Sequence, residues 1–172
     1  MKAAILTVSD RCARGEAEDS SGPALSQALE TQGVHVAARA VVPDEVGAIK
    51  RQLVRMSEEL GVDLVFTAGG TGFGPRDVTP EATEAVIERR APGIAEAMRA
   101  GSLPKTPTAM LSRGTAGLRG RTLIVNLPGS PRGALECLEI VIPVLGHAVE
   151  MIAGEGHSTE ARRHGGARAP AD

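Results

Sequence analysis

The order in which short apolar runs and helical repeats follow one another is the feature of this sequence that most restricts its fold. Four runs of mostly apolar residues have the length of buried strands: 3–8, 34–42, 62–67 and 121–127. Helical patterns lie between them. Strands that alternate with helices pair in parallel, because each helix provides the crossover that a parallel neighbour needs. The sequence therefore predicts an α/β fold: a three-layer, doubly wound and mostly parallel sheet with helices on both faces.

Prolines, glycines and hydroxyl residues mark where the helices between these strands begin and end. The first predicted helix begins at Ser21 and ends before Gly33. The second has the clearest helical stripe, with apolar residues three or four positions apart: Val46, Ile49, Leu53, Met56 and Leu60. Thr79 has the position of a capping hydroxyl for a third helix, which we expect to run to about Arg90.

The C-terminal half is punctuated by further prolines. One helix is expected to follow Pro92 and another to begin at Ser130. A proline in a helix interior removes a hydrogen bond, so we expect Pro143 to break that helix and to begin a last one, through Ile152. The segment 102–120, which follows the helix after Pro92, has no regular apolar pattern.

Length and composition restrict the class of protein. The 172 residues suffice for one domain with its own core, which we expect at 1–154. Residues 155–172 lose all apolar periodicity and are expected to form a flexible tail. A net charge of −2 argues against a nucleic-acid or membrane-surface protein, and no apolar run has the length of a spanning helix. Two isolated cysteines, Cys12 and Cys137, are typical of a reducing compartment, so we expect a cytoplasmic protein.

A glycine-rich segment follows the third predicted strand, with four glycines among residues 69–74. Glycine adopts positive φ and lets backbone N–H groups approach an anion closely, so this segment is predicted to bind phosphate. The residues predicted to do so are Gly69, Gly70, Thr71 and Gly72. The segment is neither a P-loop nor a GxGxxG motif. A flexible connection is the alternative, but a connection would not need the charged pair Arg76-Asp77 beside a helix start.

Asp44 and Asp77 each lie between a predicted strand and the helix that follows it. The carboxyl ends of parallel strands meet at one edge of a sheet, and ligands bind there in open α/β folds. Two carboxylates at that edge are positioned to share a Mg²⁺ ion that carries the phosphates of ATP. The alternative is that each aspartate caps a helix.

Two weaker candidates lie further along the chain. Ser112-Arg113 is the most structured part of an irregular segment, and a surface helix fragment is the alternative. The turn at 126–129 ends the fourth predicted strand, and an ordinary turn would have the same residues. The four histidines show no metal-ligand spacing, so none is assigned to catalysis.

Together these segments resemble the molybdopterin-binding family that includes MogA, MoaB and the G domains of gephyrin. The resemblance rests on Thr7-Val8-Ser9-Asp10, Ser21-Gly22-Pro23, Val42-Pro43-Asp44-Glu45, the residues 69–83, Ala109-Met110-Leu111-Ser112-Arg113 and Asn126-Leu127-Pro128-Gly129-Ser130-Pro131. It covers roughly residues 2–154 and implies the molybdopterin-binding fold. It is closer to the adenylating members than to the larger insertase proteins, whose extra domains have no counterpart here.

The resemblance implies an enzyme of molybdenum-cofactor synthesis, a molybdopterin adenylyltransferase that attaches AMP from Mg-ATP to molybdopterin and releases pyrophosphate. Asp44 and Asp77 would be the catalytic and metal-binding residues. The residues implied on the molybdopterin side are Ser112, Arg113, Asn126, Pro128 and Gly129. The nucleophile would be the terminal phosphate of molybdopterin, which is already ionised, so no general base is required.

Three other interpretations stay open. A MoaB-like protein would bind molybdopterin or a precursor with little AMP transfer, a scaffold module would bind without catalysis, and an unrelated α/β nucleotide-binding protein would share the motifs by accident. Molybdopterin and ATP are the implied partners, with a molybdenum insertase acting downstream. The family implies a homotrimer, with a hexamer as the alternative, and the residues do not separate molybdenum from tungsten use.

The predicted tail leads to a test. Deleting residues 159–172 should leave the melting temperature and the rate of AMP transfer nearly unchanged, because this segment has no apolar face to bury. Thermal unfolding and a turnover assay on the full-length and shortened chains measure both quantities. A large loss of either would show that the segment packs against the domain or its site.

Overall fold

A computed structural model describes residues 1–154, and the tail predicted at 155–172 lies outside them. Six strands form a single sheet in the order β2-β1-β3-β6-β5-β4. Their bounds are β1 Lys2–Val8, β2 His35–Val42, β3 Leu64–Ala68, β4 Arg89–Arg90, β5 Ala116–Arg119 and β6 Thr122–Leu127. The four strands predicted from apolar runs pair in parallel, whereas β4 and β5 are antiparallel additions at one edge. The predicted mostly parallel sheet is confirmed.

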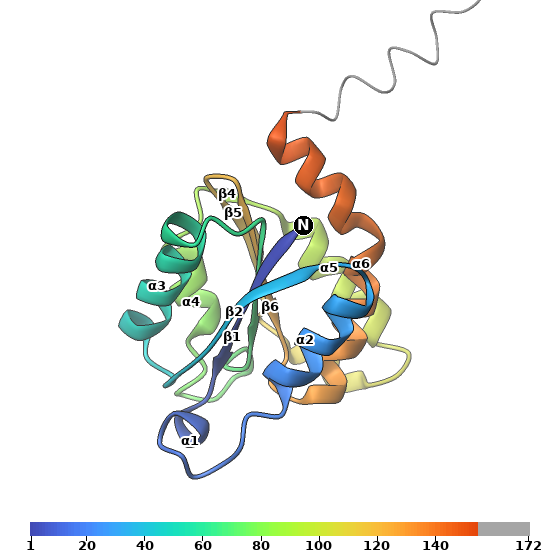
Figure 1. The fold of residues 1–172 in the computed structure, drawn as a ribbon. Helices are drawn as coiled ribbons and strands as arrows, with labels where there is room; N and C mark the ends of the chain where they lie inside the picture. Colours follow the sequence, from blue (N-terminus) through green and yellow to red (C-terminus); the bar gives the residue numbers. More distant parts are fainter. Residues whose placement is uncertain (155–172) are drawn as a thin grey trace, which may run out of the picture.

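Helices cover both faces of the sheet, as the alternation of strands and helices predicts (Figure 1). On one face lie α2 Ser21–Thr31, α5 Pro92–Ser102 and α6 Pro131–Ala153. On the other lie α3 Val46–Val54, its continuation η1 Arg55–Glu59, and α4 Thr79–Glu84. The short helix α1 Asp10–Ala13 follows β1, and η2 Pro107–Leu111 lies in the segment 102–120, which has no regular pattern in the sequence. None of the helices in residues 1–154 combines the length and the hydropathy that a membrane-spanning segment requires.

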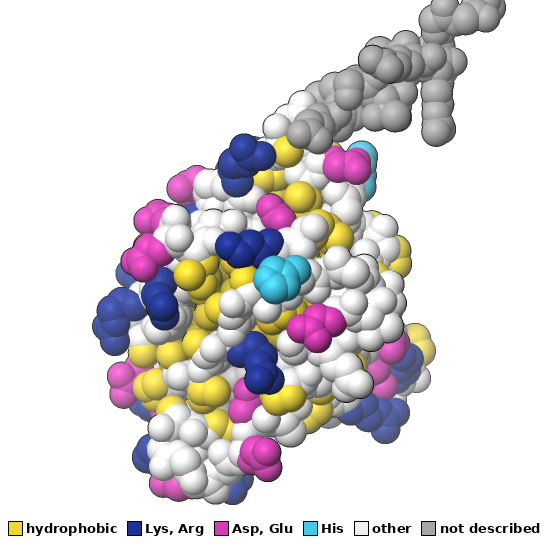
Figure 2. All heavy atoms as spheres, in the orientation of Figure 1, with side chains coloured by type: hydrophobic (Ala, Val, Ile, Leu, Met, Phe, Trp, Pro, Cys, Tyr) yellow, Lys and Arg dark blue, Asp and Glu magenta, His cyan; other side chains and the backbone are white. Residues whose placement is uncertain are grey.

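The sheet separates two apolar cores. Side chains alternate along β1, so Ala3 and Ile5 pack against α2 and α6, whereas Ala4, Leu6 and Val8 pack against α3. Because both faces are covered, β1 and β3 are buried along almost their whole length. On the face seen in Figure 2, acidic and basic side chains alternate around small hydrophobic areas.

The helix predicted to run from Thr79 to about Arg90 is shorter than expected. It ends at Glu84, and the chain then extends along β5, where Glu88 N donates to Leu118 O at 2.8 Å and Ala91 N donates to Ala116 O at 2.8 Å. Gly117 permits this close approach, because a Cβ there would lie 2.5 Å from the Ile87 side chain. The pairing that shortens α4 is made with a segment about thirty residues away, which the local pattern does not encode.

The helix break predicted at Pro143 is wrong. Helix α6 continues without interruption through Pro143 to Ala153. Pro143 and Glu139, whose carbonyl loses its usual donor, are both exposed, so water can satisfy that carbonyl. The opposite side of the helix is held in the core by Leu138, Val141 and Leu145, and this packing outweighs the lost hydrogen bond.

Replacing Pro143 with Ala should therefore stabilise the protein. The substitution restores an N–H donor inside a helix that already has the required geometry, and it removes a proline whose helical propensity is about 3 kcal/mol worse than that of alanine. The more flexible unfolded chain offsets roughly 1 kcal/mol of this gain. Urea unfolding measures the free energy, and an unchanged or lower value would show that Pro143 helps to shape α6.

Candidate functional site

The glycine loop, residues 69–78, connects β3 to α4 and passes over the end of β1. Gly69 has φ +110°, and a Cβ at this position would lie 2.2 Å from the carbonyl oxygen of Val8. Gly70 has φ +64°, and a Cβ there would lie 2.4 Å from the hydroxyl oxygen of Thr79. Both positions exclude any side chain, so the backbone itself forms the surface at this edge of the sheet.

Arg113 holds the glycine loop in place. Its Nε donates to the carbonyl of Gly72 at 2.7 Å, and its two terminal nitrogens donate to the carboxylate of Glu81 and the carbonyl of Asp77. The backbone N–H of Arg113 donates to Thr71 O at 2.9 Å. Its guanidinium is thus directed to the loop, although the resemblance implies a place on the molybdopterin side. We assign Arg113 the role of fixing the loop.

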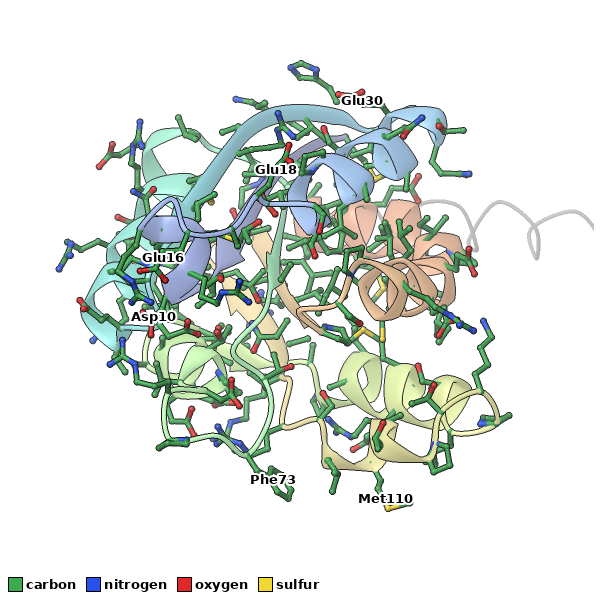
Figure 3. The ribbon with its side chains drawn as sticks, turned by 90° about the horizontal axis from the view of Figure 1, so that it is seen from below. Asp10, Glu16, Glu18, Glu30, Phe73 and Met110 are labelled. Atoms are coloured by element: carbon green, nitrogen blue, oxygen red, sulfur yellow. The ribbon has the colours of Figure 1, made fainter. Side chains whose placement is uncertain are left out.

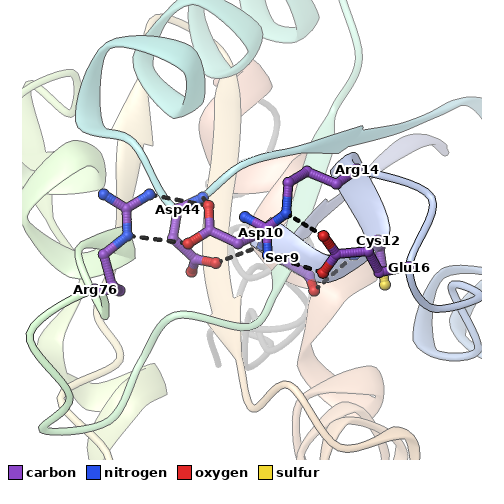
Figure 4. Close-up of polar contacts among 7 residues, drawn as sticks. All are labelled: Ser9, Asp10, Cys12, Arg14, Glu16, Asp44 and Arg76. Carbon is purple, nitrogen blue, oxygen red and sulfur yellow. Dashed lines mark hydrogen bonds and ion pairs between the residues drawn. The ribbon is translucent and has the colours of Figure 1, made fainter.

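Asp44 and Asp10 bind each other's backbone across the ends of β1 and β2 (Figure 4). Asp10 N donates to Asp44 Oδ2 at 2.7 Å, and Asp44 N donates to Asp10 Oδ1 at 3.0 Å. The guanidinium of Arg76 binds both carboxylate oxygens of Asp10, at 2.9 and 3.0 Å. Asp44 is therefore held in one orientation by a neighbour whose own charge is paired.

The electrostatic environments of these two aspartates differ. Hydrogen bonds from Arg76 lower the pKa of the Asp10 carboxyl below its usual value. Partial burial raises the pKa of Asp44, and the negative charges of Asp10 and Asp77 raise it further. The raised pKa of Asp44 indicates a carboxylate whose charged form a nearby cation would stabilise.

Asp77 and Thr79 lie with Asp44 on one side of the glycine loop, which we call the carboxylate side. Asp77 Oδ2 accepts from Gly74 N at 2.8 Å, and the same oxygen lies 2.8 Å from the place of a Cβ on Gly72. The Thr79 hydroxyl does not cap α4 as predicted, because Val78 occupies the cap position. Instead the hydroxyl is buried beneath Gly70 and has no hydrogen-bond partner among residues 1–154. The space beside Gly70 is therefore bordered by this hydroxyl and by Asp44 Oδ1.

A pocket of about 450 Å³ lies on the other side of the glycine loop, between α5, η2 and the start of α6. The predicted site residues that line it are Thr71, Gly72, Ser112, Asn126 and Pro128. Its walls are largely apolar, as is typical of pockets that bind small molecules. Phe73 at the tip of the loop is 68% exposed, and in Figure 3 its side chain points away from the body of the molecule, as does that of Met110.

The remaining predicted residues lie beside this pocket. Asp44, Asp77, Gly69 and Gly70 are on the carboxylate side of the loop, so the structure divides the predicted site into two neighbouring parts. Gly129 packs against Gly69, where a Cβ on Gly129 would lie 3.2 Å from the Gly69 Cα. Its role is close backbone packing beneath the loop.

Asn126 is 2% exposed, and both the nitrogen and the oxygen of its side-chain amide are bound within the protein. Nδ2 donates to the hydroxyls of Thr67 at 3.0 Å and Thr83 at 2.9 Å, and Oδ1 accepts from Thr115 N at 3.2 Å. Its amide thus joins β3, α4 and the segment before β5. The resemblance implies contact with molybdopterin, but this geometry gives the side chain a structural role at the base of the pocket.

Sequence reasoning missed several residues of the site. Arg99 lines the pocket from α5 and donates to the carbonyl of Gly114 at 2.9 Å. Ser130 caps α6, whose N-terminus faces the pocket. Asp10 belongs to one of the segments that carry the family resemblance, but its partner Arg76 is distant in the sequence. No group of three or more His, Cys, Asp or Glu side chains able to hold a metal exists among the described residues.

Two alanine substitutions should separate the structural residue from the pocket residue. Asn126→Ala leaves the buried hydroxyls of Thr67 and Thr83 without their donor, so it should lower the free energy of unfolding by about 1–3 kcal/mol. Ser112→Ala, at a half-buried pocket residue, serves as the control and should change it by less than about 0.5 kcal/mol. Urea unfolding of both variants tests this, and equal stabilities would contradict the assigned role of Asn126.

Comparison with known proteins identifies the family of this chain. Residues 4–147 match the family model of a probable molybdopterin binding domain. Molybdopterin adenylyltransferase of Helicobacter pylori is 44% identical over 152 residues, which cover 87% of this chain and 86% of that protein. The enzyme of the same name from Escherichia coli (strain K12) is 40% identical over 87% of this chain and 77% of its own length.

Solved structures agree with this assignment. The molybdopterin biosynthesis enzyme MoaB from Thermus thermophilus has a TM-score of 0.85 and 52% identity, covering 89% of this chain and 96% of that one. MogA has a TM-score of 0.83 and 44% identity, with coverage of 88% and 99%. The chain therefore belongs to the molybdopterin-binding domain family of molybdenum-cofactor biosynthesis.

Proposed function

We propose that this protein transfers AMP from Mg-ATP to molybdopterin and releases pyrophosphate. The observation that carries the proposal is the position of the glycine loop, which lines an apolar pocket with Thr71 and Gly72, whereas Gly70 lies beside the carboxylate of Asp44 and Gly74 N binds that of Asp77. A heterocycle and a nucleotide bound on the two sides would meet at the loop. Relatives named molybdopterin adenylyltransferase, at 40 and 44% identity over most of the chain, support this reaction.

The reaction requires positioning and charge neutralisation. A terminal phosphate oxygen of molybdopterin forms a bond to the α-phosphorus of ATP, and the bond to the bridging oxygen of the leaving pyrophosphate breaks. The attacking phosphate is ionised at neutral pH, so no side chain has to remove a proton. The backbone N–H groups of Gly70, Thr71, Gly72 and Phe73 have no partner within residues 1–154 and are available to phosphate oxygens.

The residues beside Gly70 fit a Mg²⁺ ion. Asp44 and Asp77 each use one carboxylate oxygen to bind a backbone N–H, at 2.7 and 2.8 Å, and retain a second oxygen for a ligand. The unpartnered hydroxyl of Thr79 and the space that a Cβ on Gly70 would fill lie next to Asp44 Oδ1. Hard anionic oxygens are the ligands that Mg²⁺ prefers. When bound there, the cation supplies charge neutralisation to the leaving pyrophosphate.

The oligomeric state and the cellular location of the protein belong to the same proposal. We propose a homotrimer, as the family resemblance implies, that lies in the cytoplasm, as the isolated cysteines indicate, and that passes adenylylated molybdopterin to a molybdenum insertase. Sedimentation velocity on the purified protein separates a trimer from a monomer or a hexamer.

A MoaB-like role is the second candidate, and the 52% identity to the Thermus thermophilus MoaB favours it. On this alternative the protein binds molybdopterin or a precursor in the same pocket and transfers little AMP. Incubation with purified molybdopterin, ATP and Mg²⁺, followed by detection of adenylylated product and pyrophosphate, separates the two. Tight molybdopterin binding without product would support the alternative.

The two carboxylates give the sharpest test of the metal site. Asp77→Asn keeps the shape of the side chain but removes a charge, so the variant should need more Mg²⁺ for half-maximal activity and should turn over at least about tenfold more slowly. Asp44→Asn should behave in the same way. Turnover across a Mg²⁺ titration measures both effects.

A matched control lies at the opposite end of the sheet. Asp63 binds the backbone of Lys2 at 2.8 Å, far from the loop, so Asp63→Asn should leave the Mg²⁺ dependence unchanged. Neither aspartate occupies a helix cap position in the structure, and if they only accepted the backbone N–H groups of Asp10 and Gly74, asparagine would replace them almost equally well. Near-normal turnover of both site variants at limiting Mg²⁺ would therefore remove the two residues from the metal site.

A further inference from the structure

The pocket beside the glycine loop contains one acidic side chain, that of Glu136, among all the residues that line it. Glu136 lies in the second turn of α6, and its side chain is 17% exposed. A carboxylate at this depth in a mostly apolar pocket costs solvation energy unless a partner binds it. The reaction proposed above gives Glu136 no part in phosphate chemistry, so its presence there requires another explanation.

Only one of the two carboxylate oxygens of Glu136 has a hydrogen-bond partner within residues 1–154. Oε1 accepts from Arg132 Nε at 3.0 Å, one helical turn earlier, whereas Oε2 has no hydrogen bond to any of residues 1–154. The Arg132 side chain is 85% exposed, so this ion pair is mostly in water and contributes little stability. The neighbouring Cys137 and Ser102 pair with each other at 3.6 Å and do not occupy the carboxylate.

The hydrogen-bond donors of a pterin match a carboxylate that has a free oxygen. Its pyrimidine ring carries an N3–H and a 2-amino group side by side, two parallel donors on one edge, and the ring is neutral at pH 7. A carboxylate accepts two such hydrogen bonds with its two oxygens, in the way it accepts a bidentate guanidinium. The side chains of Ala95 and Met98, which line the same pocket from α5, offer an apolar surface to the ring.

The distance along α6 between Glu136 and the glycine loop suits the length of the rest of molybdopterin. Ser130, at the start of the helix, lies beside the glycine loop through its neighbour Gly129. Six residues separate it from Glu136, which corresponds to about 9 Å along a helix axis. A pterin held at Glu136 can therefore extend its phosphate-bearing side chain along α6 toward the free N–H groups of the loop.

We propose that Glu136 recognises the 2-amino-4-oxo edge of the pterin and sets the specificity of the pocket for a pterin ring. This inference rests on the proposed function, because it names the group that selects the acceptor of the AMP transfer. It assigns to α6 a role in binding that none of the sequence motifs singled out.

The test compares two ligands that differ only in the substituent at position 2 of the ring. Neopterin 3′-phosphate carries the 2-amino group, and its 2-oxo counterpart, a lumazine, presents an acceptor in its place. The wild-type protein should bind the pterin at least about tenfold more tightly, since a bidentate pair to a charged group discriminates by about this factor or more. Equilibrium titrations followed by ligand fluorescence measure both dissociation constants.

Two variants isolate the carboxylate. Glu136→Gln keeps the size of the side chain but offers one donor and one acceptor, which match the lumazine edge, so the preference for the pterin should fall at least about tenfold. Glu139→Gln makes the same change on the exposed side of the same helix and should keep the wild-type preference. Thermal unfolding checks that both variants are folded.

The outcomes separate this inference from the proposed function. Loss or reversal of the preference in Glu136→Gln alone supports it, even if the wild-type protein fails to transfer AMP. It is overturned if Glu136→Gln keeps the wild-type preference, if the wild-type protein binds both ligands equally, or if it binds neither. AMP transfer to molybdopterin, measured separately, decides the proposed function in each case.

Discussion

The backbone of the glycine loop passes so close to the ends of β1 and β6 that no side chain fits between them. A Cβ on Gly69 would collide with the carbonyl of Val8, and Gly129 packs against Gly69 from the other side. This contact fixes the height of the loop above the sheet, and the positions of Asp77 and Thr79 follow from it. The pocket wall formed by Thr71 and Gly72 and the carboxylate side both depend on this single close approach of backbone to backbone.

The parallel core of the fold could be predicted because its information is local. Strands β1, β3 and β6 are buried on both faces, so each reads as a short, mostly apolar run, and the helices between them carry a regular apolar stripe. The edge strands β4 and β5 are short and are defined by their pairing, which apolar periodicity does not report. Pro143 shows the reverse effect: tertiary burial of one helix face outweighs a strong local preference to end the helix.

The place of the candidate site in the fold was predictable where it depends on position along the chain alone. Asp44 and Asp77 follow strands at the carboxyl edge of a parallel sheet, and the glycine loop is conspicuous in composition. Residues whose role depends on their partners were harder to interpret. Asn126 and Arg113 are polar residues next to the site, but the amide binds two threonines and the guanidinium binds loop carbonyls. A sequence gives the side chain and its element, whereas the direction in which it bonds comes from the fold.

The contacts of Arg113 have a thermodynamic consequence for the two substrates. One guanidinium binds the carbonyl of Gly72, in the wall of the pocket, and the carbonyl of Asp77, whose carboxylate lies on the opposite side of the loop. Under the proposed function, with one substrate on each side, a ligand that displaces the loop on one side would change the affinity of the other side. By linkage the effect is reciprocal: whatever factor the heterocycle imposes on nucleotide affinity, the nucleotide imposes on the heterocycle. Substitutions on the two sides of the loop should accordingly have non-additive effects on the free energy of substrate binding.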